Sequence, residues 1–341
     1  MTKTTRKSLI AICIVILLVA ACFAVMPKAL AFAAEASSDE VSPLNVNALF
    51  AGGTGTKDDP YLIENETQLK NIRSLLTYDS ASQTMRITQS FKLISTILIT
   101  SKWSPIGGYF DGSLDGNNYS IDELKIEVTT AAGLYFGLFQ QIGSKGSVHH
   151  LNLTGLSVTY PSQATSDEIY YVGGIAGRNR GAISNCKVRG NLDATNAYNA
   201  AIGSYVGINE SSIISCENYA NVTGSGYVGG IVGLNDSGGY IYGCKNFGTI
   251  SYSREKEDRC AAGIVGKSIS STVSSCDNNG TIKYVGKWVI TAIRPCMAQI
   301  IGWITDGTFS NNTYDGKCEY KNLTGKQTTY CSDGEVGRAG S

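Results

Sequence analysis

A phrase of roughly thirty residues recurs along this chain. Glycine-rich strings such as YVGGIAG and YVGGIVG are each followed by a cysteine in the same relative place. The aligned cysteines are separated by 30, 28 and 32 residues; they are Cys186, Cys216, Cys244 and Cys276. Leu151 in an earlier copy and Asn312 in a later copy occupy the same position. At least six units therefore repeat.

Each unit alternates short β-branched or apolar stretches with glycine, asparagine and serine, and none shows a helical period. This pattern predicts short strands joined by tight turns. A unit of this length cannot bury its apolar face alone, but copies stacked about 4.8 Å apart bury a continuous core. We therefore expect an all-β fold, a right-handed parallel β-helix. A propeller is the main alternative, although its repeats usually run to about forty residues or more.

The recurrent cysteine is interpreted as a small apolar filler stacked in an inward column. Leu151 at the same position favours this interpretation, while a chain of disulfides and a ligand cluster stay open as alternatives. No CxxC pair or histidine-rich spacing indicates a zinc site. Two other pairs are disulfide candidates in an exported protein, namely Cys260 with Cys296 on successive coils and Cys318 with Cys331 around the polar tail.

The first residues resemble an export signal. Basic residues precede the apolar run LIAICIVILLVAACFAVM, and small-residue ends ALA and AFA follow a proline. This predicts a secretory signal peptide cleaved near Ala33 or Ala34. The alternatives are a lipoprotein box that ends at a lipidated Cys22 and an uncleaved membrane anchor. All three place the remainder outside the cytoplasm, either secreted or at the cell surface.

The charge balance argues against one class of partner. The leader carries four of the 28 basic residues and no acidic residue, which leaves 24 basic against 28 acidic residues. A mildly acidic chain is a poor candidate for nucleic-acid binding. No later apolar run is long enough to span a membrane, so we expect membrane attachment only through an uncleaved leader or Cys22.

The series GTGTKDDPYLI, KLISTILI, WSPIG and FDGSLDGNNYSI, followed by YFGLF, YVGGIAG and YVGGIVG, resembles the GLUG-repeat proteins, which are exported or surface-attached proteins of bacteria. The resemblance covers roughly residues 50 to 315. It implies a β-helical surface module, in a family sometimes found beside immunoglobulin-A-directed peptidases and adhesin-like segments, and it implies no activity. The chain departs from the family at Thr96, where relatives commonly have aspartate, and at Ser204, which replaces a glycine.

Five parts are expected along the chain. Asn65 and Gln68 have the spacing of an N-cap and its capping-box partner, ahead of an amphipathic helix that covers the first coil. The expected parts are residues 1–34 as signal peptide, 35–50 as linker, 51–84 as strand–helix cap, 85–316 as β-helix with GLUG-like repeats, and 317–341 as C-terminal cap and polar tail.

The sequence offers little catalytic machinery. There is no HExxH, and His149 and His150 are adjacent; alternation in a strand would send one inward and one outward, which predicts a turn or packing pair. The candidate acids of a polysaccharide lyase or glycosidase are Asp111, Asp115 and Asp306. Each lies beside a glycine, where aspartate commonly stabilises a turn.

The favoured function is therefore a non-enzymatic surface protein that binds a glycan or a host protein. Tyr170, Tyr198 and Tyr227 lie near expected coil corners and are candidates for an aromatic binding strip, with corner packing as the alternative. A carbohydrate-active β-helix enzyme is the alternative function, and a non-catalytic piece of a larger peptidase system is a third. No catalytic residue, metal or cofactor is expected, and the sequence leaves the oligomeric state open.

Overall fold

The computed structural model describes residues 46–129, 133–160, 168–197, 199–253, 259–285, 296–321, 327–328 and 336–340. The predicted leader with Cys22, and also Tyr198 and Cys331, lie outside the described residues. The chain divides into two units, Met1–Val46 and Asn47–Ser341, and the solenoid belongs to the second. Among the described residues, no helix combines the length and the hydropathy needed to cross a membrane.

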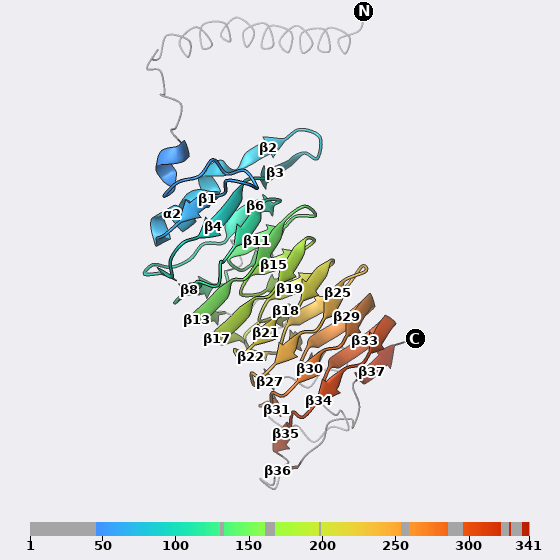
Figure 1. Ribbon diagram of the computed structural model, residues 1–341. Coiled ribbons are helices and arrows are strands. Elements are labelled where there is room, and N and C mark those ends of the chain that lie inside the picture. Colours follow the sequence, from blue (N-terminus) through green and yellow to red (C-terminus); the bar gives the residue numbers. More distant parts are fainter. Residues whose placement is uncertain are drawn as a thin grey trace, which may run out of the picture. The chain divides into compact units, whose positions relative to one another are not determined.

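Three sheets form the second unit (Figure 1), and from Tyr135 to Tyr314 the chain passes through all of them in turn, whereas the strands before Tyr135 belong to two of the sheets. Sheet A contains β1 (Tyr61–Ile63), β2 (Thr77–Asp79), β3 (Thr84–Ile87), β4 (Ser90–Leu93), β6 (Ile106–Phe110), β7 (Ser113–Asp115), β11 (Phe139–Ile142), β12 (Ser147–His149), β15 (Ala176–Asn179), β16 (Ala182–Ser184), β19 (Val206–Asn209), β20 (Ser212–Ile214), β24 (Val232–Asn235), β25 (Tyr240–Tyr242), β29 (Val265–Ser274), β33 (Ile301–Ser310) and β37 (Val336–Gly340).

The remaining strands form the other two sheets. Sheet B contains β5 (Ile97–Leu98), β8 (Ser120–Asp122), β9 (Lys125–Glu127), β13 (Asn152–Thr159), β17 (Lys187–Ala194), β21 (Glu217–Asn218), β22 (Asn221–Gly224), β26 (Lys245–Asn246), β27 (Ile250–Tyr252), β30 (Asp277–Asn278), β31 (Ile282–Tyr284), β34 (Thr313–Tyr314), β35 (Cys318–Lys321) and β36 (Gln327–Thr328). Sheet C contains β10 (Tyr135–Phe136), β14 (Tyr170–Val172), β18 (Ala200–Gly203), β23 (Tyr227–Gly229), β28 (Cys260–Ala262) and β32 (Cys296–Ala298).

Strands of successive coils pair in parallel. For example, β16 pairs with β20, and β20 pairs with β25, residue against residue and without a shift. Among the described strands, the antiparallel pairs are β2 with β3 near the start and β35 with β36 near the end. Parallel pairing between neighbouring repeats confirms the β-solenoid and excludes a propeller, whose blades are built from antiparallel strands.

A short helix near the start confirms the expected cap. After the 3-10 turn η1 (Val46–Leu49), α2 (Glu66–Asn71) continues into the 3-10 turn η2 (Ile72–Leu75). Asn65 Oδ1 accepts a hydrogen bond from the Gln68 amide at 3.0 Å, and Gln68 Oε1 accepts one from the Glu64 amide at 2.8 Å. The buried face of this helix consists of Leu69, Ile72 and Leu75.

The residue before the cysteine column has the same unusual backbone in the six coils that contribute to this column. These residues have φ between +51° and +62°, the left-handed region; they are His150, Asn185, Ser215, Gly243, Ser275 and Asn311. A single left-handed residue turns the chain sharply between sheets A and B. This repeated corner sets where the side chains on either side of it point.

Two ladders of buried asparagine side chains run across the coils, and the sequence analysis did not predict them. In sheet A, Asn179 Nδ2 donates to Asn209 Oδ1 at 2.8 Å, Asn209 Nδ2 donates to Asn235 Oδ1 at 2.8 Å, and Asn235 Nδ2 donates to a serine hydroxyl. The second ladder lies at the sheet B corner and consists of Asn218, Asn246, Asn278 and Gln299, joined at 2.6–2.7 Å. The asparagines of both ladders are fully buried.

The two departures from the GLUG pattern are accommodated locally. Ser204 is fully buried, and its hydroxyl donates a hydrogen bond to the Gly230 carbonyl of the next coil. Thr96 Oγ1 lies 3.4 Å from Ser120 Oγ on the following coil. Both positions are thus tied to the neighbouring coil by a side-chain hydroxyl.

Candidate binding face of the solenoid

The second half of sheet A presents two outward columns of side chains. In β20, β25 and β29 three consecutive residues form a segment whose central residue is buried and whose flanking residues point outward, whereas the central Phe309 of the same segment in β33 is 42% exposed. Toward the C-terminal coils these columns carry tyrosines and hydroxyls. We call this surface the tyrosine–hydroxyl face, and it consists of Tyr240, Tyr242, Thr272, Ser274, Thr308 and Ser310.

Two parallel rings dominate this face. Tyr240 and Tyr242 flank the buried Ile241, and they are 38% and 42% exposed. Their ring centroids are 6.0 Å apart and the planes differ by 6°. Since rings held side by side on one strand lose little side-chain entropy on contact with a ligand, they form a pre-organised apolar platform.

The hydroxyls beside the rings hydrogen-bond across the coils. Thr272 Oγ1 lies 3.0 Å from Thr308 Oγ1, and Ser274 Oγ lies 3.1 Å from Ser310 Oγ. Each hydroxyl of such a pair uses one donor or acceptor and keeps further hydrogen-bonding capacity. The face therefore combines apolar rings with polar groups that can donate and accept.

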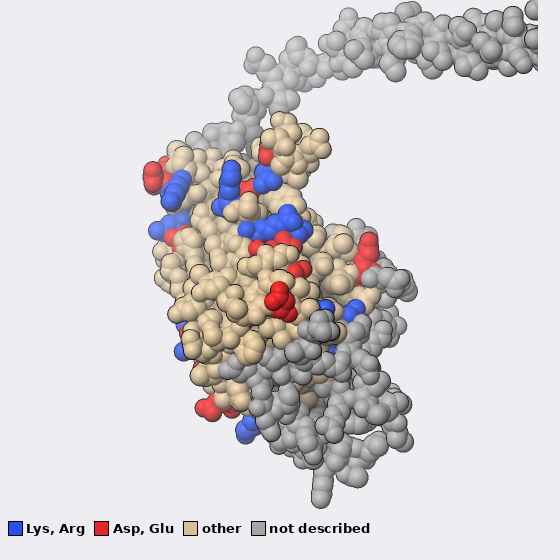
Figure 2. Space-filling model, turned by 90° about the vertical axis from the view of Figure 1, so that its right-hand side faces the viewer, with Lys and Arg blue, Asp and Glu red and all other residues tan. Residues whose placement is uncertain are grey.

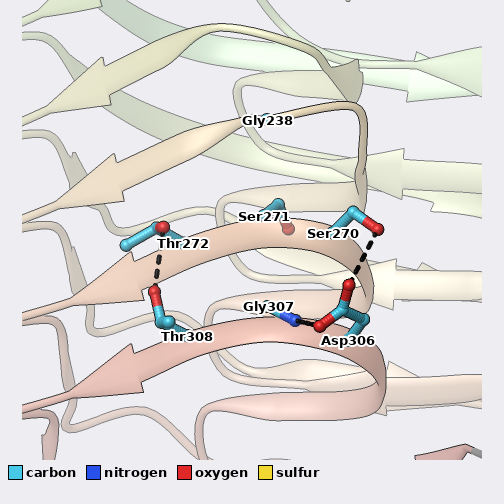
Figure 3. A pocket seen from close by; sticks show the side chains of 7 residues that line it. All are labelled: Gly238, Ser270, Ser271, Thr272, Asp306, Gly307 and Thr308. Carbon is cyan, nitrogen blue, oxygen red and sulfur yellow. Dashed lines mark hydrogen bonds between the residues drawn. The ribbon is translucent and has the colours of Figure 1, made fainter.

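A shallow hollow adjoins the hydroxyl columns at the turn within β29 and β33 (Figure 3). Asp306 Oδ1 accepts a hydrogen bond from the Gly307 amide at 2.8 Å, and Asp306 Oδ2 lies 3.5 Å from Ser270 Oγ. Ser270 and Asp306 both have left-handed backbones, with φ of 45° and 63°. The lining residues are Gly238, Ser270, Ser271, Thr272, Asp306, Gly307 and Thr308.

The predicted tyrosine strip does not form an exposed surface. Tyr170 is 2% exposed and packs in the interior against Phe136 and Tyr160, with ring centroids 6.5 and 5.7 Å away. Tyr227 is 6% exposed and lies beneath Lys267, whose Nζ is 5.2 Å from the ring centroid. Tyr198 is outside the described residues. Alternation in the string GYIYGC was the signal for the exposed rings that the sequence analysis missed.

Of the three candidate catalytic acids, one is buried and one is far from the other two. Asp111 is 8% exposed and forms an ion pair with Arg86. Asp115 and Asp306 lie near opposite ends of the same sheet, on β7 and β33. The paired carboxylates of glycosidases are about 5–10 Å apart, whereas six coil spacings separate these strands by roughly 29 Å. Asp306 is therefore too far from Asp115 to form a glycosidase pair with it, and Asp111 is held in a buried ion pair.

The histidine pair corrects the expectation from strand alternation. His149 ends β12, and His150 adopts the left-handed corner with φ of 51°. The corner reverses the alternation, so both rings lie outside the core, with Nδ1 atoms 3.0 Å apart. Both approach Asp115, whose Oδ1 is 3.4 Å from His149 Nδ1 and 3.9 Å from His150 Nδ1.

The cysteines occupy two kinds of environment. Those of the repeat column are free and buried, and they stack between Leu151 and Asn312; they are Cys186, Cys216, Cys244 and Cys276. Cys260 and Cys296 form a disulfide between β28 and β32, with a Cα–Cα distance of 4.7 Å. Cys318 is buried, and Cys331 lies outside the described residues, so that pairing stays a prediction.

The column thiols are expected to be chemically silent. Burial raises the pKa of the Cys216 and Cys244 thiols well above the usual range, and the thiolate is the reactive form. We expect iodoacetamide to leave both unlabelled in the folded protein and to label both in guanidinium chloride, as read by peptide mass spectrometry. Rapid labelling of Cys244 under native conditions would argue against the filler role.

Charges on the solenoid surface are mixed. Figure 2 shows Lys and Arg side chains interspersed with Asp and Glu on one face, with no broad patch of a single sign among the described residues. On sheet B, Lys187, Glu217, Lys245 and Asp277 alternate in sign along one column, and Lys187 Nζ lies 2.9 Å from Glu217 Oε2. The described part of that face and this column of sheet B thus lack the basic stripe that a phosphate backbone attracts.

These features define a parallel β-solenoid repeat protein with an exposed face of tyrosines and hydroxyls. Residues 169–193 match the GLUG motif, which confirms the resemblance seen in the sequence. The motif spans β14, β15, β16 and most of β17, the coil that carries the first cysteine of the column.

Two curated relatives are similar over part of the chain. A protein named "Putative Gly-rich membrane protein" from Evansella cellulosilytica is 36% identical over 152 residues, which cover 42% of this chain and 16% of that protein. Halomucin from Haloquadratum walsbyi is 30% identical over 172 residues, which cover 48% of this chain and 2% of that protein. The aligned parts are thus small fractions of both relatives, whose names indicate a surface location.

One solved structure shares the fold. The crystal structure of a "putative immunoglobulin A1 protease" from Bacteroides ovatus superposes with a TM-score of 0.51 and 19% sequence identity, over 86% of this chain and 87% of that chain. At this identity the likeness shows the solenoid architecture alone. Together, the motif, the fold and the relatives' names indicate a surface β-helical protein.

Proposed function

We propose that this chain is an exported, non-enzymatic surface protein that binds carbohydrate through its tyrosine–hydroxyl face. The observation that carries the proposal is the parallel pair Tyr240 and Tyr242, exposed beside columns of threonine and serine hydroxyls. A sugar ring has apolar C–H faces and a rim of hydroxyls. Exposed aromatic rings complement the apolar C–H faces, and fixed hydroxyls and a carboxylate complement the hydroxyl rim.

The shape of the face supports a chain-like ligand. The outward columns continue from coil to coil at the spacing of stacked strands, about 4.8 Å. The hollow at Asp306 lies on the same columns as Thr272 and Thr308, so one extended ligand can contact the rings, the hydroxyls and the hollow together. A polysaccharide or a glycoprotein glycan has that extended form.

Export is part of the same proposal. The predicted leader and the disulfide Cys260–Cys296 both support a location outside the cytoplasm, because structural disulfides persist in oxidising compartments. The carbohydrate-active enzyme is the weaker candidate, because Asp111 is buried in an ion pair and Asp306 lies roughly 29 Å from Asp115.

A binding experiment tests the proposed face. On a glycan array, the double variant Tyr240→Ala/Tyr242→Ala should bind its best glycan at least about 10-fold more weakly than wild type, because aromatic anchors carry much of the binding free energy. The matched control is Tyr219→Ala/Phe247→Ala, which removes another exposed stacked pair, 4.8 Å apart, from sheet B.

Three outcomes would count against the proposal. Equal binding by wild type and the tyrosine variant would exclude this face, and equal loss in the sheet B control would show that the effect is not local. Turnover of a polysaccharide by wild type would favour the enzyme instead. Circular dichroism on all variants shows whether the solenoid is intact.

A further inference from the structure

Both histidines of the chain lie beside one carboxylate near the start of the solenoid. Asp115 ends β7, His149 ends β12 in the same outward column, and His150 occupies the adjacent corner. We propose that Asp115 Oδ1, His149 Nδ1 and His150 Nδ1 form a binding site for a divalent transition-metal ion of the Zn²⁺ type. This inference does not depend on the proposed carbohydrate binding, and it departs from the absence of a metal site expected from the sequence.

The three atoms form a triangle of suitable size. Their separations are 3.0, 3.4 and 3.9 Å. The point equidistant from all three lies about 2.0 Å from each atom, and Zn–N and Zn–O bonds in proteins measure about 2.0–2.2 Å. An ion at or just above the plane of the triangle therefore reaches all three ligands with the backbone as it stands.

The donor set selects a class of metal. Imidazole nitrogen suits Zn²⁺, Ni²⁺ and Cu²⁺, whereas Ca²⁺ and Mg²⁺ prefer oxygen ligands alone. The Asp115, His149 and His150 side chains are 28%, 30% and 46% exposed. The remaining coordination positions of the ion would thus face solvent, open to water or to a carboxylate of a ligand.

Neighbouring groups prepare the ligands. Ser113 Oγ lies 3.4 Å from His149 Nε2, so it can accept the Nε2–H and leave the lone pair of Nδ1 for a metal. The backbone amide of Asn117 donates a hydrogen bond to Asp115 Oδ1 at 2.8 Å and holds that carboxylate in place.

One cation opposes the site. Lys92 Nζ lies 4.0 Å from Asp115 Oδ2, the carboxylate oxygen that the proposed site does not use. The lysine keeps that oxygen turned away from the histidines, while its positive charge repels an incoming ion. We therefore expect an accessible and reversible site, not a closed structural one.

The repeats themselves supply variants that preserve the fold. His149→Ser and His150→Asn reproduce Ser184 and Asn185, the residues at the same two positions of the next coil. Asparagine is also well suited to the left-handed backbone of position 150. Both variants remove an imidazole without removing the corner.

Isothermal titration calorimetry with ZnCl2 at neutral pH tests the site on the whole exported chain. Wild type should bind about one Zn²⁺, and His149→Ser and His150→Asn should each weaken binding by more than about 10-fold. Asp306→Asn, a distant acid on the same sheet, should bind as wild type does. Because the chain has two histidines, Zn²⁺ should shift the ¹⁵N imidazole signals of both.

The proposal fails if wild type shows no stoichiometric Zn²⁺ binding. It fails equally if the double variant His149→Ser/His150→Asn, folded by circular dichroism, binds as tightly as wild type. That second result would place the ion on other groups, such as thiols.

Discussion

Replacing Asn246 by alanine is expected to lower the free energy of unfolding by about 3 kcal/mol or more. Asn246 Oδ1 accepts from Asn218 Nδ2 at 2.7 Å and from the Gly248 amide at 3.2 Å. Its Nδ2 donates to Asn278 Oδ1 at 2.7 Å and to the Gly248 carbonyl at 3.2 Å. The substitution leaves each of these buried groups short of one hydrogen bond, with no water to replace it.

Asn221→Ala is the matched control. Asn221 Nδ2 also donates to an asparagine of the neighbouring coil, Asn191 Oδ1, at 3.1 Å, but this contact is exposed. Water can replace an exposed hydrogen bond, so we expect a change within about 0.5 kcal/mol. Guanidinium chloride unfolding followed by circular dichroism compares the two. Equal guanidinium chloride midpoints of unfolding for the two variants would show that the buried ladder does not stabilise the coils.

Replacing Gly230 by alanine should also cost about 3 kcal/mol, at the upper end of the usual effect of overpacking. A Cβ at this position would lie 1.9 Å from the Gly263 carbonyl oxygen of the next coil and 2.8 Å from the Asn246 side chain. The nearest obstacle is backbone, so relief requires the two coils to move apart. That movement would stretch the parallel hydrogen bonds on both sides.

Gly107→Ala is the matched control, because it makes the same glycine-to-alanine change at a position without steric conflict. Gly107 has no left-handed φ, and a Cβ there would meet no atom closer than the Gln140 side chain at 3.6 Å. We expect a neutral or slightly stabilising effect, because alanine restricts the unfolded chain. Thermal unfolding of both variants provides the comparison. A Gly230→Ala protein as stable as Gly107→Ala would mean that the coils tolerate wider spacing than the structure shows.

The two proposed sites share one pair of outward columns but are separated along the solenoid. Asp115 and His149 occupy the column that reaches Tyr242 three coil steps after His149, roughly 14 Å along the stack. The distance lets each site be tested without disturbing the other. Loss of zinc binding should therefore leave glycan binding by Tyr240 and Tyr242 unchanged.

Local pattern was enough to predict the architecture. Apolar residues at the same position of each repeat must face one core, so the repeat length and the aligned Cys186 and Cys216 predict stacked coils. The N-cap at Asn65 is equally local, since the side chain and the amide that it binds are three residues apart. Such features depend on neighbours in the sequence, and the structure confirms this fold.

The corner conformations and the side-chain partners on neighbouring coils could not be predicted from the sequence. Strand alternation predicted opposite directions for His149 and His150, but a left-handed residue at position 150 ends the alternation. The buried partners of Asn246 are 28 and 32 residues away, and asparagine in the sequence indicated only turns. The sequence also did not show which tyrosines are exposed: Tyr170 is buried and Tyr242 is exposed.

The sequence by itself determined that this chain stacks coils of about thirty residues around columns of apolar and thiol side chains, because a repeating pattern can bury its apolar face only against its own copies. The tertiary structure alone decided which polar side chains meet. Register and corner geometry bring residues from different coils within hydrogen-bond distance. Those contacts created the asparagine ladders, the tyrosine–hydroxyl face and the His–His–Asp cluster.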